Sequence, residues 1–95
     1  MLIEKPPAIN DVVTIKLTSG EELIATLVEE NTNYIKVGKP RVLVNAAQGL
    51  GMSPYLFTVD PDRNVKISRT TVVVLEPTEK ESASSYTKAT SGLIL

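Results

Sequence analysis

Short runs in which apolar and polar residues alternate recur along this chain, and turn residues separate them. The clearest run covers residues 12–18, where Val13, Ile15 and Leu17 alternate with polar residues. A period of two places alternate side chains on opposite faces of a strand, so this run predicts a half-buried β-strand. The Ser-Gly pair at residues 19–20 is a turn signal. The feature that most constrains the fold is therefore a strand that runs directly into a tight turn.

The next run, residues 21–30, is compatible with either a helix or a strand. Its Glu, Leu and Ala residues favour a helix. We prefer a strand, because a tight turn directly after a clear strand predicts a hairpin. Further strands are predicted at residues 34–37, 41–44, 55–59, 65–67 and 71–75.

The connections between these runs carry turn chemistry. Gly38-Lys39-Pro40 predicts either a bulge or a bend within one long strand. Residues 45–54 are small and glycine-containing, so we interpret them as a loop. Together with residues 55–64 they are expected to form an extended hairpin. Five or six short strands with such connections favour an all-β barrel or sandwich.

The C-terminal part differs in composition. We divide the chain into a β-domain over residues 1–77 and a tail over residues 78–95, and we expect no helix longer than about two turns. The tail is rich in Ser, Thr and Lys, which by itself favours disorder. Its last three residues, Leu93, Ile94 and Leu95, are apolar, and we expect them to dock the tail on an apolar groove of this chain or a neighbour.

The chain contains no cysteine and no histidine. This removes thiolate catalysis, disulfides, the histidine general base and most zinc sites. The acidic pairs at residues 21–22 and 29–30 do not converge, because adjacent strand residues point to opposite faces. We therefore expect neither an enzyme nor a bound metal or cofactor. No apolar run reaches about 18 residues and no signal peptide is recognisable, so we expect a cytoplasmic protein without a membrane span.

The net charge of −1 hides an uneven distribution. Residues 1–35 have a balance of −4, residues 36–69 of +4, and residues 70–95 of −1. An anionic partner would therefore be sought in the middle third. A mixed, solvated surface is the alternative interpretation of the same charges.

Two stretches resemble the two motifs of the Sm/LSm family. Over residues 12–37 the chain reads VVTIKLTSGEELIATLVEENTNYIKV, in which Gly20 occupies the turn, Ala25 the small-residue position and Leu27 the conserved leucine position of the first motif. Over residues 65–77 it reads VKISRTTVVVLEP, whose apolar spacing is similar to the second motif. The resemblance implies a small, strongly bent, five-stranded antiparallel barrel of the Sm-like (SH3-like) type, here with an extended hairpin over residues 45–64.

The resemblance also implies a site for single-stranded RNA. The family's Asp and Asn that flank the third strand correspond here to Glu30 and Tyr34, and its Ile-Arg-Gly becomes Ile67-Ser68-Arg69. The candidate RNA-binding residues are Tyr34, Lys36, Lys66, Ser68 and Arg69. Tyr34 could stack a base and the cations could meet phosphate. The alternatives are cross-strand packing for the tyrosine, ordinary surface charge for the cations and a local backbone bond for Ser68.

Sm-like proteins form rings, and this chain is expected to form a homo-oligomeric ring of five to seven subunits. The consecutive apolar residues Val72, Val73, Val74 and Leu75 are the predicted seam, because a strand buried on both faces needs a neighbour. Two functions follow: a ring that binds single-stranded RNA, or a structural ring that contacts other proteins and no nucleic acid.

Overall fold

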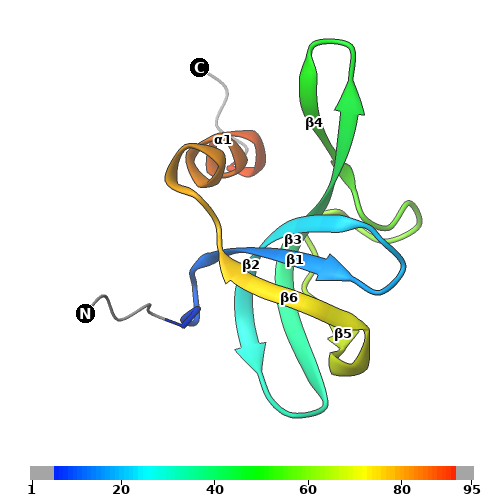
Figure 1. Cartoon of the computed structure of the whole chain (residues 1–95), viewed down its shortest axis with the longest axis vertical. Helices are drawn as coiled ribbons and strands as arrows, with labels where there is room; N and C mark the ends of the chain where they lie inside the picture. The colour runs from blue at the N-terminus through cyan, green and yellow to red at the C-terminus, as the bar shows by residue number, and fades with distance from the viewer. Residues whose placement is uncertain (1–5, 92–95) are drawn as a thin grey trace.

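The computed structural model describes residues 6–91 of the chain. Its elements are β1 (Val12–Leu17), β2 (Glu22–Glu30), β3 (Tyr34–Ala46), β4 (Gly49–Pro54), β5 (Val65–Ser68), the 3-10 turn η1 (Arg69–Thr71), β6 (Val72–Pro77) and α1 (Lys80–Thr90) (Figure 1). The strand interpretation of residues 21–30 is thus confirmed. Within the described residues no helix is long and apolar enough to cross a membrane.

The six strands of residues 6–91 form one antiparallel sheet: five follow the order β4-β3-β2-β1-β6, and β5 pairs with β3 off this path. β3 is long enough to serve two partners: its first part pairs with β5 and its second part with β4. The prediction of a β-rich fold is confirmed. The residue pattern predicted five or six strands and the resemblance implied five; the sheet has six. It is not closed by hydrogen bonds, since β5 pairs with β3 and β6 with β1.

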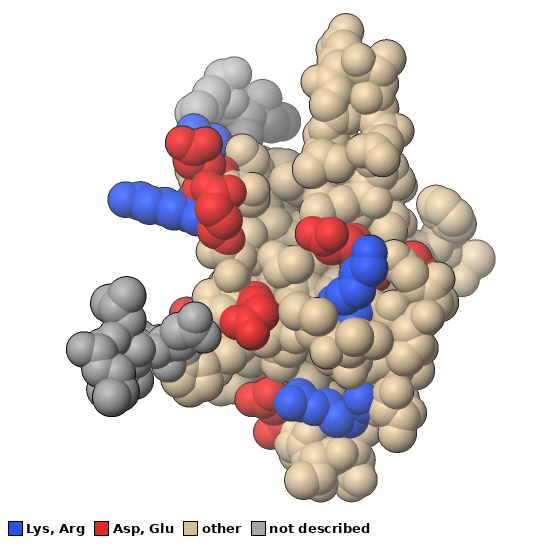
Figure 2. Space-filling view, in the orientation of Figure 1, with Lys and Arg blue, Asp and Glu red and all other residues tan. Residues whose placement is uncertain are grey.

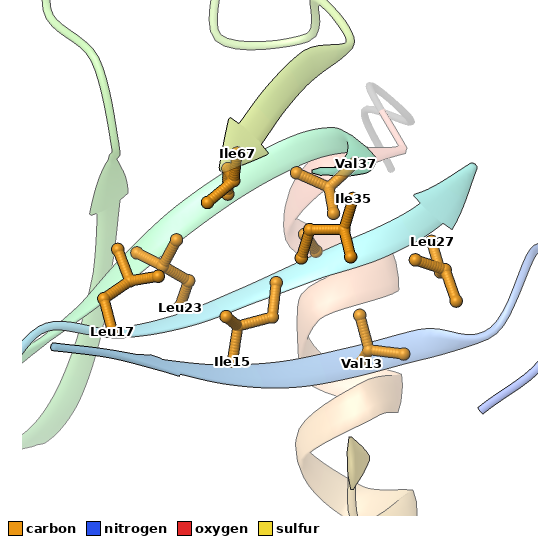
Figure 3. Packing of buried hydrophobic residues seen from close by; sticks show 9 residues of the cluster. Val13, Ile15, Leu17, Leu23, Leu27, Ile35, Val37 and Ile67 are labelled. Atoms are coloured by element: carbon orange, nitrogen blue, oxygen red, sulfur yellow. The ribbon is translucent and has the colours of Figure 1, made fainter. Parts of the chain in front are cut away.

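One face of the sheet carries the core, and we call it the inner face. Its cluster consists of Val13, Ile15, Leu17, Leu23, Ala25, Leu27, Ile35, Val37 and Ile67, all buried (Figure 3). These residues alternate along β1, β2, β3 and β5, as the period-two pattern predicts. The opposite face of the sheet is called the outer face.

A bend interrupts β3 at the Gly-Lys-Pro segment: the register with β2 shifts across this segment and again between Val37 and Lys36. Lys39 adopts a positive φ of 50°. Gly38 is buried, and a Cβ there would lie 2.8 Å from the Asn64 side-chain oxygen. The predicted bend within one long strand is therefore present, and a larger residue at position 38 would have to displace the Asn64 side chain.

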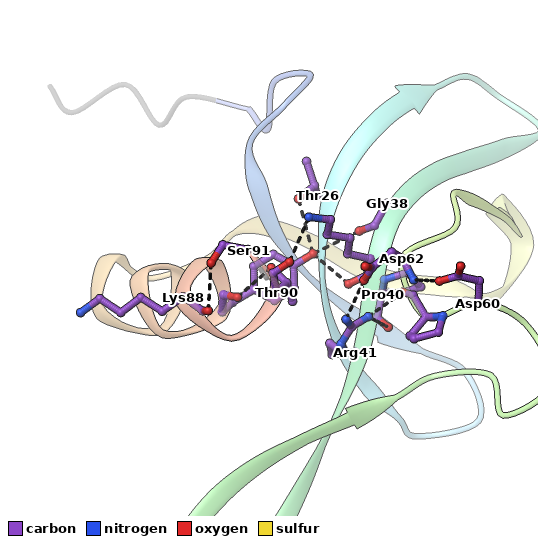
Figure 4. A network of polar contacts seen from close by, with 12 residues as sticks. Thr26, Gly38, Pro40, Arg41, Asp60, Asp62, Lys88, Thr90 and Ser91 are labelled. Atoms are coloured by element: carbon purple, nitrogen blue, oxygen red, sulfur yellow. Dashed lines mark hydrogen bonds and ion pairs between the residues drawn. The ribbon is translucent and has the colours of Figure 1, made fainter. Parts of the chain in front are cut away.

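The bend is held by helix α1, which packs on the outer face (Figures 1 and 4). The Tyr86 hydroxyl donates to the carbonyls of Gly38 (3.1 Å) and Lys39 (2.8 Å), and the Lys39 ammonium donates to the Thr90 carbonyl (3.0 Å). Tyr86 is 1% exposed. The helix has 11 residues, about three turns, so the expectation of no helix beyond two turns was wrong.

The helix begins at an N-cap, Glu79, whose carboxylate accepts hydrogen bonds from the Glu81 amide and the Ser82 hydroxyl. These bonds hold the pKa of Glu79 below its usual value. Apart from Tyr86 and Thr90 the helix buries no residue. Leu93, Ile94 and Leu95, which were expected to dock the tail, lie outside the described residues.

Residues 45–64 differ from the prediction in detail. The segment expected to be a loop supplies β4, which pairs with the end of β3 in a projecting hairpin, while residues 55–59 form no strand. Proline at position 54 ends β4, and the following loop folds back over β3. Arg41 anchors that loop by donating to the Pro61 carbonyl (2.6 Å) and to the Asp62 carboxylate (3.0 Å) (Figure 4). Whether each of these segments forms a strand depends on a pairing partner that lies elsewhere in the sequence.

Candidate nucleic-acid interface

The pairing of β3 with β5 brings the candidate RNA-binding residues together. Tyr34 lies opposite Ser68, and Lys36 lies opposite Lys66. The residues between them, Ile35 and Ile67, point into the core, so these four side chains share the other face of the ladder. The arrangement follows from the alternating pattern once the register is fixed.

Arg69 joins this surface from the first residue of η1. Its backbone amide donates to the Asn33 carbonyl at 2.9 Å, which ties η1 to the turn between β2 and β3. That turn is itself fixed by Asn31, whose side-chain oxygen accepts from the amides of Asn33 (2.8 Å) and Tyr34 (3.0 Å). We call Tyr34, Lys36, Lys66, Ser68 and Arg69 the β3–β5 surface.

An aromatic ring lies at the centre of the surface. The Lys66 ammonium is 4.7 Å from the centroid of the Tyr34 ring, which is cation–π geometry. The Tyr34 hydroxyl donates to the Glu29 carboxylate at 2.7 Å. The ring is therefore held at both ends, by a lysine over its face and an acid at its edge.

Two acids of β2, residues 29 and 30, complete the surface. Glu29 pairs with Lys36 at 3.4 Å, and Glu30 pairs with Arg69 at 2.8 Å. The Tyr34 hydroxyl bond is the main cause that lowers the pKa of Glu29; desolvation opposes it, and Lys36 adds to it. Three cations thus face two carboxylates, and the local positive charge is small.

Sequence reasoning overlooked these acids as partners of the surface. It treated the 29–30 pair as solvated charge because neighbouring strand residues point to opposite faces. At the end of β2 the register shifts between Leu27 and Glu29, and the strand is about to turn, so both carboxylates reach cations of the same surface. The signal that could have found them is the resemblance itself, which aligned Glu30 with a site residue.

The local contacts of Ser68 differ from the backbone bond that the alternative interpretation predicted, because its hydroxyl bonds another side chain. Its hydroxyl lies 3.0 Å from the Thr70 hydroxyl, and its carbonyl accepts from Thr71 at 2.8 Å. These bonds stabilise η1 and leave the Ser68 side chain exposed.

The predicted seam lies along β6, at the edge of the sheet beyond β1. Val72 and Leu75 pack against the core, whereas Val73 is 61% and Val74 40% exposed. The register explains this division: Leu17 pairs with Val72 and Lys16 with Val74, so Val73 is an extra, bulged residue. The bulge turns two apolar side chains toward solvent.

Residues 6–91 contain no group of three or more acidic, histidine or cysteine side chains that could hold a metal ion. Their buried side-chain polar atoms all have hydrogen-bond partners. The chemistry offered by the β3–β5 surface is therefore ionic contact, hydrogen bonding and stacking on one tyrosine ring.

Comparison with known proteins gives no relative: no protein-family model matches the sequence, and no curated protein matches it. The functional interpretation consequently depends on this chain's own residues and geometry.

Proposed function

We propose that this chain is an Sm-like module that assembles into a ring and binds single-stranded RNA on the β3–β5 surface. The observation that carries the proposal is convergence. The β2–β3 turn and the β5–η1 segment are more than 30 residues apart in sequence, yet the Arg69 amide bonds the Asn33 carbonyl at 2.9 Å. The Sm/LSm resemblance aligns its site residues with these same two segments.

A nucleotide would meet three kinds of group on this surface. The Tyr34 ring can stack a base, and such stacking contributes about 1–3 kcal/mol per base. Lys36 and Arg69 can exchange their carboxylate partners for phosphate, since both pairs are solvent-accessible and exposed ion pairs are weak. The site in one subunit is shallow, and several copies in a ring would raise its avidity.

Ring formation is supported by the two edges of the sheet. β4 and β6 lie at opposite ends of the strand order, and both are six residues long. Two unlike edges allow a head-to-tail contact, in which β6 of one subunit pairs with β4 of the next. Such pairing would satisfy the unpaired backbone of both edges and cover Val73 and Val74.

A structural ring that contacts proteins is the second candidate. The observation in its favour is that carboxylates form ion pairs with two of the three cations on the β3–β5 surface. A ligand must compete with these pairs, and a purely structural module would show the same pairing.

The test is mass by light scattering, with and without a fluorescently labelled oligouridine strand. A ring mass together with anisotropy that rises at moderate salt supports the RNA proposal. A ring mass with no change up to high micromolar protein favours the structural ring, and a monomer mass contradicts assembly. Arg63→Ala is the matched control for Arg69→Ala, because Arg63 lies in the loop before β5 and its side chain forms no ion pair among residues 6–91.

A further inference from the structure

A hollow opens on the outer face between helix α1 and the β3–β4 hairpin. Its volume is about 420 Å³, within the range of small ligand-binding clefts. Ile24, Leu43, Leu50 and Met52 form its apolar floor and hairpin wall. Figure 2 shows the hollow between the helix and the projecting hairpin.

A second hollow of about 360 Å³ continues the first toward the turn between β1 and β2. The two share three lining residues, Glu22, Leu43 and Leu50. The result is one elongated depression, which we call the outer trough. Its shape suits an extended chain better than a compact molecule.

The charged residues of the trough are mostly acidic. Glu22, Glu79 and Glu81 line the first hollow, and the second adds Glu21 and one cation, Lys16. Among residues 6–91, neither Glu22 nor Glu81 forms an ion pair. Figure 2 shows acidic side chains on α1 and on the sheet beside the hairpin, while the hairpin from residue 42 to 54 has no charged residue.

We propose that the outer trough binds an extended segment of a partner protein that carries both apolar and basic side chains. The apolar side chains would cover Leu43, Leu50 and Met52, and the lysines or arginines would pair with the free carboxylates of the rim. Complementary charge of this kind sets the register and specificity of a contact. Nucleic acid does not fit, because its phosphates would face the acidic rim.

The trough is separate from the β3–β5 surface, and none of its lining residues belongs to that surface. The proposal therefore does not depend on RNA binding. Either one can fail while the other holds.

The test is an NMR titration of the ¹⁵N-labelled full chain with a synthetic, end-blocked peptide in which leucine and lysine alternate. We expect amide shifts at Ile24, Leu43, Met52 and Ser82, and binding about tenfold weaker for the peptide with glutamate in place of lysine. Shifts confined to the β3–β5 surface, or equal binding of both peptides, would overturn the proposal.

Variants locate the contact within the trough. Glu81→Lys should weaken binding about threefold, the range of one exposed charge pair, and Leu50→Ser should weaken it about fivefold by removing an apolar contact. Leu50 is 72% exposed, so its loss leaves the fold intact. Asp60→Lys, the same charge change in the loop before β5, lies outside the lining of both hollows and should have no effect; an effect equal to that of Glu81→Lys contradicts the assignment.

The chain's own C-terminal residues are the competing occupant, and a variant distinguishes them. Leu93→Asp would repel that segment from an acidic trough. If the full-length variant binds the leucine–lysine peptide about tenfold more tightly, the trough is filled by the chain itself and the partner assignment is wrong. Unchanged affinity supports a separate partner.

Discussion

The β3–β5 surface and the outer trough are built from the same sheet but in opposite ways. On the β3–β5 surface the charged groups are paired with one another, as in Lys36 with Glu29 and Arg69 with Glu30. In the trough, Glu22 and Glu81 form no ion pair within the described part of the chain, and they lie beside an apolar floor. To bind a ligand, the β3–β5 surface must break ion pairs within the chain, whereas the outer trough must only release water.

The difference lies in how the two regions are assembled. The β3–β5 surface follows from strand register alone, since every member lies on β2, β3, β5 or the adjoining η1. The first hollow of the trough exists because α1 lies against the sheet, whereas α1 does not line the second hollow. Tyr86 is the main anchor of that helix. Changes at the helix should therefore alter one region and leave the other intact.

Tyr86→Ala should separate the two regions most strongly. Removing a buried aromatic side chain costs about 3–5 kcal/mol of unfolding free energy, and here it also leaves the β3 bend without its hydroxyl donor. We expect the urea midpoint to fall and the leucine–lysine peptide to bind more weakly, because the helix wall of the first hollow is lost. Oligouridine binding by the protein that remains folded should persist; its loss in parallel would mean that the regions are coupled.

Tyr86→Phe should have a smaller effect, because the ring remains and only the hydroxyl is lost. The unsatisfied carbonyls of Gly38 and Lys39 should cost about 1–3 kcal/mol. Burial raises the pKa of the Tyr86 phenol above its usual value. The unfolded chain then loses its proton first, so stability should fall as the pH rises above about 10. Denaturation curves across this range should show a shallower decline for Tyr86→Phe than for the native chain.

Arg69→Ala and Glu30→Gln should change RNA affinity in opposite directions. The first removes a cation and should weaken oligouridine binding about fivefold and lower the slope against salt by about 0.7, the value for one phosphate contact on a single strand. The second frees Arg69 from its carboxylate and should strengthen binding about twofold. Anisotropy titrations at several salt concentrations measure both. Weaker binding by Glu30→Gln would show that the ion pair organises the site.

Acidic pH should lower the stability of both regions, in each case by protonating one carboxylate. The pKa values of Glu29 and Glu79 lie below the usual 4.5, so each contributes stability above that pH and loses it as the pH falls through the native value. Chemical denaturation from about pH 7 to about pH 3 should therefore show declining stability. Glu29→Gln and Glu79→Gln should each flatten the decline, and an unchanged curve in both would contradict the assignment.

Alternation and turn residues predicted those strands whose formation depends on the local sequence. Alternation gave the strands at residues 12–18 and 34–37, and the turn at Gly20 gave their hairpin partner. The helix was overlooked because it buries only Tyr86 and Thr90, too few residues for a helical period, and begins at a glutamate in place of the usual Ser, Thr or Asp. The residues at 49–54 were taken for a loop because glycine weakens strand propensity, whereas pairing with β3 overrides it.

The candidate site likewise has a part that the sequence predicted and a part that it did not. The five residues of the β3–β5 surface could be named from the sequence because they lie in two short stretches with recognisable spacing. Their partners Glu29 and Glu30 depend on a register shift near the end of β2, and the first hollow of the trough depends on the helix, so neither followed from the pattern of a single segment.

The two unlike sheet edges also bear on how the protein behaves in concentrated solution. A subunit that offers β6 at one end and β4 at the other can add copies indefinitely unless the rotation per step brings the last copy back to the first. Closure would give a single mass that is independent of concentration, whereas a failed closure would give fibres that lengthen with it. If subunits pair as proposed, a substitution that alters only the angle between neighbours would convert the ring into a filament without changing the fold of any subunit.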